Sequence, residues 1–577
     1  MRRKLSLLML CAVLLLSLPQ PSARALGSAE DLIRIGLYYG DEALPSANLQ
    51  NVTGAGAGYQ VGWFDGNDIF NNLGFLPEVY LTMTPDTSCQ VQLDQQFFSY
   101  DEARLIADQY GTDAFVAYDG GFRVRIGNFS SYYDAADYAA MYGGYAIESS
   151  LSGYTIRETN TGEFLFEFDL GGASLAVRPV IDLFVENEGA ETWFKGRKYY
   201  GSFEYTRSGS VLTVANVVSM EEYVRGVVPY EMSPSWPLEA LKTQAVCART
   251  YAYANLHKHS RQGFDLCNTT ECQVYFGTNA ATELTDRAVA ETAGQVITYN
   301  GELIDAVYYA SNGGASENSE NVWYNALPYL RAVRDDFEAL TNTAYTDWSY
   351  ELTLSDITNI LRDRGNSISG SIVHAYATYT DAGNMSCLTF LDASGKKFEY
   401  EGERARSVFN VDGYRINVRS QRFIFEDKHH MRIQSNAEIT NVSAGSGAAP
   451  GGAQYGTALV AASRVLTAGG LQMGGIRYPA SAPILTADGI ENAEIVTTIS
   501  GASGFSANTA PTEPGRISAA SLKIPASCSG TFVIRGSGNG HNVGLSQYGA
   551  KAMAEQGYTY QQIIPYYYTG VLIDTMQ

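Results

Sequence analysis

Apolar residues recur at helical spacing between residues 237 and 256. The positions are Leu238, Leu241, Ala245, Ala248 and Ala252. This spacing predicts a long helix, with Pro237 in its first turn, that packs one face on a core. Glu239, Lys242 and Arg249 fall largely off that face, so we expect them on the polar side of the helix.

A shorter helix is predicted just upstream, beginning after Ser219. Ser219 and Glu222 have the S-x-x-E spacing of a capping box, and Pro229 favours an end to this helix. Glu231 would then lie in a turn between two helices, among apolar neighbours that favour its protonated form near neutral pH. Such a carboxyl group is suited to donate a proton. The alternative is that Glu231 only interacts with the positive end of the following helix.

Strand patterns dominate the first part of the chain. The alternating run IRIGLYYG at 33–40 opens a strand-rich segment, 26–86. In the next segment, 87–157, VQLDQQF predicts a strand and YDEARLIADQYG a helix. A strand, a turn and a second helix follow between residues 122 and 145. We therefore expect a small α/β module at 87–157.

The first 25 residues have the three parts of a secretory signal peptide. They are a basic start, an apolar run from Leu5 to Leu18, and Ala23-Arg24-Ala25 before the expected cleavage site. The apolar run is too short for a confident membrane span, although an uncleaved anchor is an alternative. The sequence thus predicts a secreted or cell-envelope protein with no transmembrane segment beyond the signal.

The net negative charge of the chain argues against nucleic acid as a partner. The 577 residues carry a net charge of −22, and removal of residues 1–25, with four basic residues and no acid, makes it −26. Such a chain binds nucleic acid poorly. The 40 Tyr residues are consistent with stacking on sugar rings and equally with packing in strands.

Four blocks of sequence resemble, in order, the SpoIID/LytB family of peptidoglycan-active proteins. They are GVVPYEMSPSWPLEALKTQAVCARTYA (226–252), FDLCNTTECQVYFG (264–277), YYASNGGASENSENVW (308–323) and GSGNGHNVGLSQYGAKAMAEQGYTYQQIIPYYYTGV (536–571). The resemblance covers roughly 160–430 and 528–577. It implies a catalytic domain in two parts, 158–430 and 526–577, separated by a Gly-, Ala- and Ser-rich insertion at 431–525.

The resemblance also implies an activity. Family members are lytic transglycosylases, which cleave the MurNAc–GlcNAc bond of glycan strands without consuming water, and Glu231 matches their catalytic glutamate. Ordinary glycosidases need two carboxylates. A lytic enzyme can use one, because the C6 hydroxyl of the substrate attacks the anomeric carbon. Glu231 would first donate a proton and then accept one.

Further residues are expected to line the saccharide cleft. They are Tyr230, Gln273, Tyr275, Ser311, Asn312, Gly313, Gly314, His541, Gln547 and Tyr548. The last block departs from the usual family pattern G-H-G-V-G-M-S-Q, because Asn542 replaces a glycine. Asn tolerates positive φ better than most residues, so we expect the turn to persist.

The 87–157 module resembles a SPOR domain, a ferredoxin-like module that binds glycan strands stripped of peptide. Arg125 and Phe129 lie in its strand-to-turn signature and would contact the glycan. The alternative is a generic strand-helix-strand fragment.

A His/Cys cluster follows the catalytic block and has ligand types suited to zinc. The resemblance implies a metal held by His259, Cys267 and Cys272, with His257, Glu271 or water as a fourth ligand. The alternative is a Cys267–Cys272 disulfide, since export permits oxidation.

The expected fold is α+β: a strand-rich SpoIID-like catalytic domain with a long helix after the catalytic turn, preceded by the small ferredoxin-like module. The expected function is a secreted lytic transglycosylase acting on peptide-stripped glycan. The alternative is a non-catalytic, glycan-binding enhancer of a cell-wall amidase.

Overall fold

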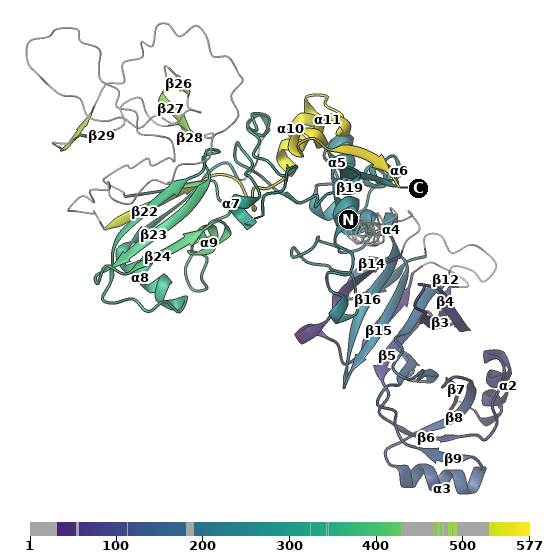
Figure 1. The fold of residues 1–577 in the computed structure, drawn as a ribbon. Coiled ribbons are helices and arrows are strands. Elements are labelled where there is room, and N and C mark those ends of the chain that lie inside the picture. The colour runs from purple at the N-terminus through teal and green to yellow at the C-terminus, as the bar shows by residue number, and fades with distance from the viewer. Residues whose placement is uncertain are drawn as a thin grey trace, which may run out of the picture. The chain divides into compact units, whose positions relative to one another are not determined.

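The computed structural model in Figure 1 describes residues 32–52, 57–111, 113–180, 190–323, 325–341, 343, 345–427 and 530–576, together with short strands between 465 and 492. The predicted signal peptide and most of the predicted insertion lie outside the described residues. The chain divides into two compact units. Unit 1 comprises Met1–Ser235, Gln244–Thr298 and Ile573–Gln577, and unit 2 comprises Trp236–Thr243 and Tyr299–Leu572.

Unit 1 contains a seven-stranded sheet in the order β17-β1-β16-β15-β12-β3-β4. The predicted strand at 33–40 is β1, which pairs antiparallel with β16 and parallel with β17. The bounds are β1 (Leu32–Tyr38), β3 (Gly58–Phe64), β4 (Phe70–Leu76), β12 (Leu175–Val180), β15 (Ser202–Ser208), β16 (Val211–Ser219) and β17 (Leu266–Cys267). Alternating residues of β1, such as Ile33 and Ile35, are fully buried, which explains its period-2 pattern.

A second sheet of unit 1 has the order β14-β13-β2-β5-β10-β11-β7-β8-β6-β9. Its first half consists of β14 (Arg197–Tyr199), β13 (Thr192–Phe194), β2 (Ala47–Asn51), β5 (Tyr80–Pro85), β10 (Tyr154–Glu158) and β11 (Phe164–Phe168). Leu49, Leu81 and Phe194 are buried on one face of these strands, and the residues that alternate with them face the other side.

The predicted 87–157 module forms the other half of that sheet. It runs β6 (Cys89–Gln92), α2 (Tyr100–Tyr110), β7 (Ala114–Tyr118), β8 (Phe122–Phe129), α3 (Tyr132–Tyr142) and β9 (Tyr145–Ile147). This is a β-α-β-β-α-β order with strands arranged β7-β8-β6-β9. Strand β6 ends before most of VQLDQQF, and β7 was not predicted. Because β11 pairs parallel with β7, the module continues into the rest of the sheet.

Helix α4 (Met220–Glu231) begins as predicted, with a capping box between Ser219 and Glu222. The prediction that Pro229 ends it is wrong, because the helix continues to Glu231. Proline removes one hydrogen bond. Burial of Val227, Val228 and Pro229 itself accompanies this loss and favours the continued last turn.

Helix α5 (Leu238–Ala254) confirms the predicted long helix. Arg249 was expected on a polar side, and this expectation is wrong. Its side chain is fully buried and forms two hydrogen bonds of 2.7 Å with the Glu221 carboxylate. A bidentate partner makes burial of the guanidinium tolerable. Helix α6 (Glu283–Ala290) packs against α4.

Unit 2 is built on two three-stranded sheets that share one core. One contains β21 (Trp348–Thr353), β31 (Thr531–Gly536) and β25 (Phe423–Asp427), and the other β22 (Ile372–Tyr379), β23 (Met385–Asp392) and β24 (Lys397–Glu401). Helix α8 (Leu354–Asp363) packs on β21 and β22. Asp427 at the end of β25 pairs with Phe532 near the start of β31, so the two parts of the sequence that flank the predicted insertion meet in adjacent antiparallel strands.

The blocks 308–323 and 536–571 meet in a smaller pair of strands. β20 (Tyr308–Tyr309) pairs parallel with β32 (Leu545–Ser546). Helices α10 (Gln547–Glu555) and α11 (Tyr560–Tyr567) follow β32 directly. Among the described residues, none of the helices is long and apolar enough to cross a membrane.

Candidate functional site

Glu231 is the last residue of α4, and its side chain is half-buried. The backbone N–H of Val274 donates a hydrogen bond to Glu231 Oε1 at 2.8 Å. Helix α4 is fixed at its start by the capping box and along its length by buried residues. The carboxylate is therefore held by local helix geometry at one side and by the segment 272–277 at the other.

Two predicted substrate contacts, Gln273 and Tyr275, turn out to be buried. Tyr223 donates its hydroxyl to Gln273 Oε1 at 2.9 Å, and Tyr275 donates to Asn216 Oδ1 at 2.6 Å. A Cβ at Gly226 would lie only 2.3 Å from the Tyr275 ring, so glycine lets α4 approach this segment. These contacts give Gln273 and Tyr275 the role of holding the segment against α4, rather than of touching a ligand.

Tyr230 is half-buried and lies edge-to-face with Phe276, with ring centroids 5.4 Å apart. The guanidinium of Arg197 lies 3.5 Å from the centroid of Phe276 and 6.0 Å from that of Tyr230. An aromatic and cationic surface thus lies next to the catalytic candidate in sequence and within the same unit. Sequence reasoning missed Arg197, because nothing local in its hairpin indicates this stacking.

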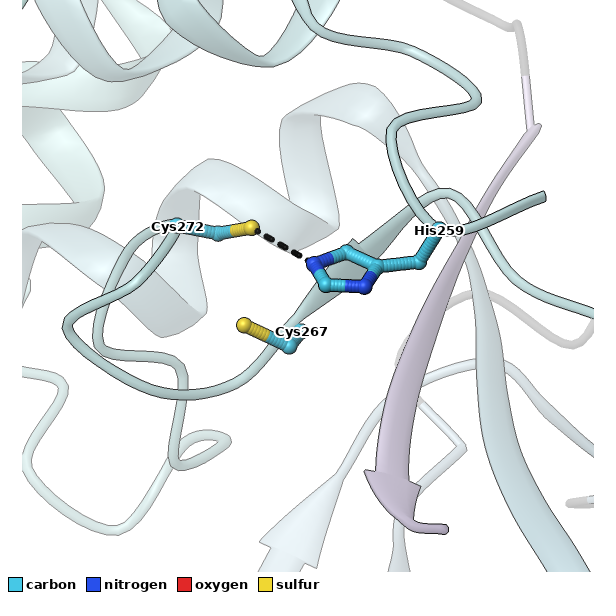
Figure 2. Close-up of side chains that lie close together, drawn as sticks. All are labelled: His259, Cys267 and Cys272. Carbon is cyan, nitrogen blue, oxygen red and sulfur yellow. Dashed lines mark hydrogen bonds between the residues drawn. The ribbon is translucent and has the colours of Figure 1, made fainter. Parts of the chain in front are cut away.

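Figure 2 shows His259, Cys267 and Cys272 turned toward one another. Their ligand atoms all lie within 4.8 Å, and His259 Nε2 is 3.3 Å from Cys272 Sγ. The other ring nitrogen, Nδ1, is 2.6 Å from Gln262 Oε1. A hydrogen bond at Nδ1 leaves Nε2 as the ligand atom, as in many metal sites. The two cysteines are free thiols, not a disulfide.

The donor set fits a zinc ion. Tetrahedral zinc holds sulfur at about 2.3 Å and nitrogen at about 2.0 Å, so ligand atoms roughly 3.5–3.8 Å apart are required. A hydrogen bond with Cys272 lowers the pKa of the Cys267 thiol, whereas the same bond, together with burial, raises the pKa of the Cys272 thiol. A thiolate beside a thiol is a ready cation ligand.

Of the two side chains expected as a fourth ligand, Glu271 has an atom near His259, although its side chain is 62% exposed, much like that of His257. Glu271 Oε1 is 3.7 Å from His259 Nε2. The His257 side chain is 65% exposed, and its Nδ1 lies 2.8 Å from Asp265. Since Cys272 is two residues before Val274, the last residue of the cluster and the partner of Glu231 belong to one short segment.

In unit 2 the predicted loop Ser311–Gly314 and the block 536–548 come together. Ser311 and Asn539 exchange backbone hydrogen bonds of 3.0 and 2.7 Å. Asn542 donates its Nδ2 to the carbonyl of Asn312 at 3.2 Å. Its φ is 64°, which confirms the prediction that asparagine keeps this turn.

A buried acid that sequence reasoning missed, Glu338, holds these two blocks in place. It accepts backbone N–H bonds from Asn312 at 2.9 Å and Gly313 at 3.0 Å. The hydroxyls of Ser311 and Ser546 also donate to it, the latter at 2.6 Å. Burial raises the pKa of this carboxyl. Ser311 and Asn312 are fully buried, so they shape the loop rather than face a ligand.

Both ring nitrogens of His541 form hydrogen bonds within unit 2, so this side chain supports the fold. Its Nε2 lies 3.0 Å from the carbonyl of Tyr308, and its Nδ1 accepts from the N–H of Val543 at 3.2 Å. The ring contacts Tyr309 and Trp323. Desolvation lowers the pKa of His541 to about 4, which matches a neutral ring that donates at one nitrogen and accepts at the other.

Of the other predicted contacts in unit 2, Gln547 is buried and Tyr548 is half-buried. Tyr548 packs edge-to-face on Trp236, with centroids 4.9 Å apart, and contacts Tyr345. Gly313 and Gly314 have φ of 66° and 122° and are both partly exposed. Tyr548, Gly313 and Gly314 therefore keep part of their surface accessible to a ligand.

In the 87–157 module, Arg125 is buried and pairs with Glu167, while its Nε donates to Gln92 at 3.0 Å. Burial raises the pKa of Glu167 to about 7. Arg125 thus supports the sheet. Phe129 is more accessible and begins a row of rings on α3, with centroid distances of 5.5 Å to Tyr138 and 4.4 Å from Tyr138 to Tyr142.

Comparison with known proteins places the site residues in a family context. The model of the SpoIID family, described as stage II sporulation protein, matches residues 208–299. That stretch contains Glu231, Val274 and the His259, Cys267 and Cys272 cluster.

Relatives named amidase enhancer and stage II sporulation protein D support the same family, and a third relative is uncharacterized. An amidase enhancer of Bacillus subtilis is 28% identical over 356 residues, 61% of this chain and 40% of the relative. The stage II sporulation protein D of B. subtilis is 36% identical over 137 residues, 21% and 40% of the two chains. An uncharacterized protein of Brachyspira hyodysenteriae is 38% identical over 167 residues, 29% and 45%. The chain thus spans less than half the length of each relative.

Proposed function

We propose that this protein is a lytic transglycosylase that acts outside the cytoplasm on peptidoglycan glycan strands, with Glu231 as its acid and base. The observation that carries the proposal is the Glu231 carboxyl group, held at the end of α4 by the N–H of Val274 within the stretch that matches the SpoIID family. The match supports the family, and the geometry supplies a single oriented carboxyl group.

The reaction needs two proton transfers, one from Glu231 and a later one back to it. Because Oε1 accepts from Val274, we assign the transferable proton of Glu231 to Oε2. It passes to the glycosidic oxygen as the bond from that oxygen to C1 of MurNAc breaks. The C6 hydroxyl of the same MurNAc then forms a bond to C1 and returns its proton to Glu231. The products are a 1,6-anhydromuramoyl end and a GlcNAc with a free 4-hydroxyl, and no water is consumed.

The arrangement around Glu231 suits an extended, neutral-to-anionic polymer. Tyr230 and Phe276 offer ring faces and edges for sugar rings, and Arg197 supplies a positive charge beside them. In the 87–157 module the Phe129, Tyr138 and Tyr142 row offers a second aromatic surface, which we assign to retention on the glycan.

The metal cluster would have a structural part in this scheme. His259, Cys267 and Cys272 would hold zinc, with Glu271 as the fourth ligand. Bound zinc would supply a cross-link between the end of α5 and the segment that carries Val274. Proton transfer remains with Glu231.

A second candidate function is a glycan-binding enhancer of a cell-wall amidase. It is favoured by the 61% of this chain that aligns with a relative named amidase enhancer. Such a protein would bind glycan and stimulate a partner without cleaving a bond itself.

One experiment separates the two. Purified glycan strands without peptides are incubated with wild type and with Glu231→Gln, and the products are identified by mass spectrometry. Anhydromuramoyl ends from wild type alone support the transglycosylase. Hydrolytic reducing ends contradict the lytic step. Retention on glycan without cleavage, together with faster amidase turnover on mixing, supports the enhancer instead.

A further inference from the structure

A cleft of about 340 Å³ lies on unit 1, on the second sheet and outside the family-matched stretch. Its lining includes Asn48, Gln50, Tyr80, Thr159, Trp193 and Lys195, with Ser46 and Leu49 beside them. Its size is in the range of small-ligand sites. None of these residues had been singled out by sequence, because they come from three separate strands and two turns.

Register places the lining residues on one face of the sheet. Trp193 of β13 lies opposite Gln50 of β2, and Gln50 lies opposite Tyr80 of β5. Directly paired residues of antiparallel strands point to the same side. Leu49, Leu81 and Phe194 fill the other side, so the row Trp193, Gln50 and Tyr80 faces outward.

The chemistry of this row is that of a saccharide site. An aromatic ring stands at each end, with Tyr80 38% exposed and Trp193 half-buried. Between them Gln50 donates its Nε2 to the Tyr80 hydroxyl at 3.2 Å, which orients the amide. The amide of Asn48 is exposed beside it. Rings that stack on the apolar face of a sugar, with amides that bond its acetamido and hydroxyl groups, combine apolar contact with directed polar groups.

Lys195 adds a positive charge at the rim. It sits at the tip of the β13–β14 hairpin, where φ is 48° for Lys195 and 82° for Gly196, as in a type I′ turn. Lys195 is exposed, and its Nζ lies 5.9 Å from the Tyr38 ring centroid. In a chain of net charge −22, a lysine at a cleft favours a ligand with a carboxylate.

The residues that follow Val274 contact an edge strand of the sheet that carries the cleft. Thr278 donates its N–H to the carbonyl of Lys198 in β14 at 2.8 Å, so the residues after Val274 run beside that edge strand. From β14 to β5 there are three strand spacings, about 14 Å at ~4.8 Å each. A polymer lying across the row would extend toward that edge.

We propose that this cleft is a saccharide subsite for an N-acetylated amino sugar, stacked on Trp193, whose carboxylate pairs with Lys195. Within a glycan strand this is a MurNAc whose lactyl carboxylate has been freed of peptide. The proposal rests on the proposed function for the identity of the polymer, but not for the presence of a sugar site.

The test uses two probes on the full chain: chitotetraose, which has acetamido groups and no carboxylate, and purified peptide-free glycan strands. The indole N–H signal of Trp193, assigned by its loss in Trp193→Phe, reports the cleft alone in NMR spectra. It is expected to shift on saturation with either probe. Gln50→Ala should weaken binding at this signal about tenfold for both probes.

Lys195→Ala tests the contribution of the lysine charge to binding separately from that of the Trp193 ring. This variant should bind peptide-free glycan about fivefold more weakly and bind chitotetraose as tightly as wild type does. The control Lys397→Ala, which changes an exposed lysine of β24, should leave the affinity for both probes unchanged. An unmoved Trp193 signal with both probes overturns the proposal, and so does chitotetraose binding that Gln50→Ala leaves unchanged in a folded variant. A shifted signal in a protein that cleaves no glycan keeps the subsite and rejects the transglycosylase. Cleavage of glycan together with an unmoved Trp193 signal rejects the subsite and keeps the transglycosylase.

Discussion

The backbone N–H of Val274 donates to the carboxylate of Glu231, with 2.8 Å between nitrogen and Oε1. Val274 lies two residues after Cys272, a member of the His/Cys cluster. The position of the candidate acid therefore depends on a segment that begins with the proposed metal ligand Cys272 and contains the buried Tyr275 just after Val274.

Replacing Glu231 with glutamine should remove activity and preserve the fold. The amide oxygen can still accept from Val274, so the free energy of unfolding should change by less than about 1 kcal/mol. Loss of general acid and base catalysis should slow glycan cleavage about 10²–10⁴-fold. Product release from peptide-free glycan and urea unfolding measure the two effects.

Glu222→Gln is the matched control, because Glu222 lies in the same helix but serves its capping box. It should lower stability by about 0.5–1 kcal/mol and leave cleavage unchanged. Equal cleavage by Glu231→Gln and wild type would contradict the assigned role.

Zinc should bind in a 1:1 ratio and stabilise unit 1. Elemental analysis of the purified protein is expected to find one zinc per chain, and Cys267→Ser or Cys272→Ser should lose it. Ion present at 100–1,000 times its dissociation constant adds about 3–4 kcal/mol to stability. A chelator should therefore lower the melting temperature of wild type.

The free thiol Cys387, which belongs to unit 2 and not to the cluster, supplies the control. Cys387→Ser should retain zinc, and Glu271→Ala should weaken zinc binding more than His257→Ala does. Full zinc content in both Cys267→Ser and Cys272→Ser would rule out this cluster as the site.

His541 should make unit 2 sensitive to acid. Its folded pKa, about 4, lies below the ordinary value of 6.5. The neutral ring therefore contributes stability that is present above pH 6.5 and is lost as pH falls through about 4. Urea unfolding of wild type should show a contribution of about 1–3 kcal/mol that disappears over this window.

His541→Asn lacks that titration. Its oxygen can still accept from Val543, although the bond to Tyr308 is lost. The variant should be less stable than wild type at pH 7, and the difference should shrink toward pH 4. A constant difference across the window would mean that the folded ring is not held neutral.

Glu338 should be required for the loop that joins Ser311 to Ser546. In Glu338→Gln an NH₂ group would face N–H or O–H donors, because Glu338 accepts from Asn312, Gly313 and both serines. The expected loss is about 1–3 kcal/mol of unfolding free energy. Glu399→Gln, at an exposed position of β24, should cost little.

The pH dependence of Glu338 has the opposite sign to that of His541. Burial raises its pKa above the ordinary glutamate value, so its contribution is fully present below that value and declines as pH rises through the folded pKa. Wild-type unit 2 should show this decline and Glu338→Gln should not. Identical pH profiles would contradict the burial of the charge.

Local pattern alone determined several elements of this protein. Apolar spacing placed α5, alternation placed β1, and the S-x-x-E pair placed the start of α4, because each depends on residues within a turn or two of one another. The positive φ of Asn542 was likewise predicted from the intrinsic tolerance of asparagine. Order of motifs along the chain also indicated which residues to test.

Only the tertiary structure decided which polar residues are available for binding. Gln273, Tyr275 and His541 were expected at a ligand, but hydrogen bonds to residues tens or hundreds of positions away bury or occupy them. Glu338 and Arg249 gave no local signal of burial, because their partners come from other elements. The physical reason is that a buried polar group must find a partner wherever the fold supplies one, and sequence spacing does not encode that distance.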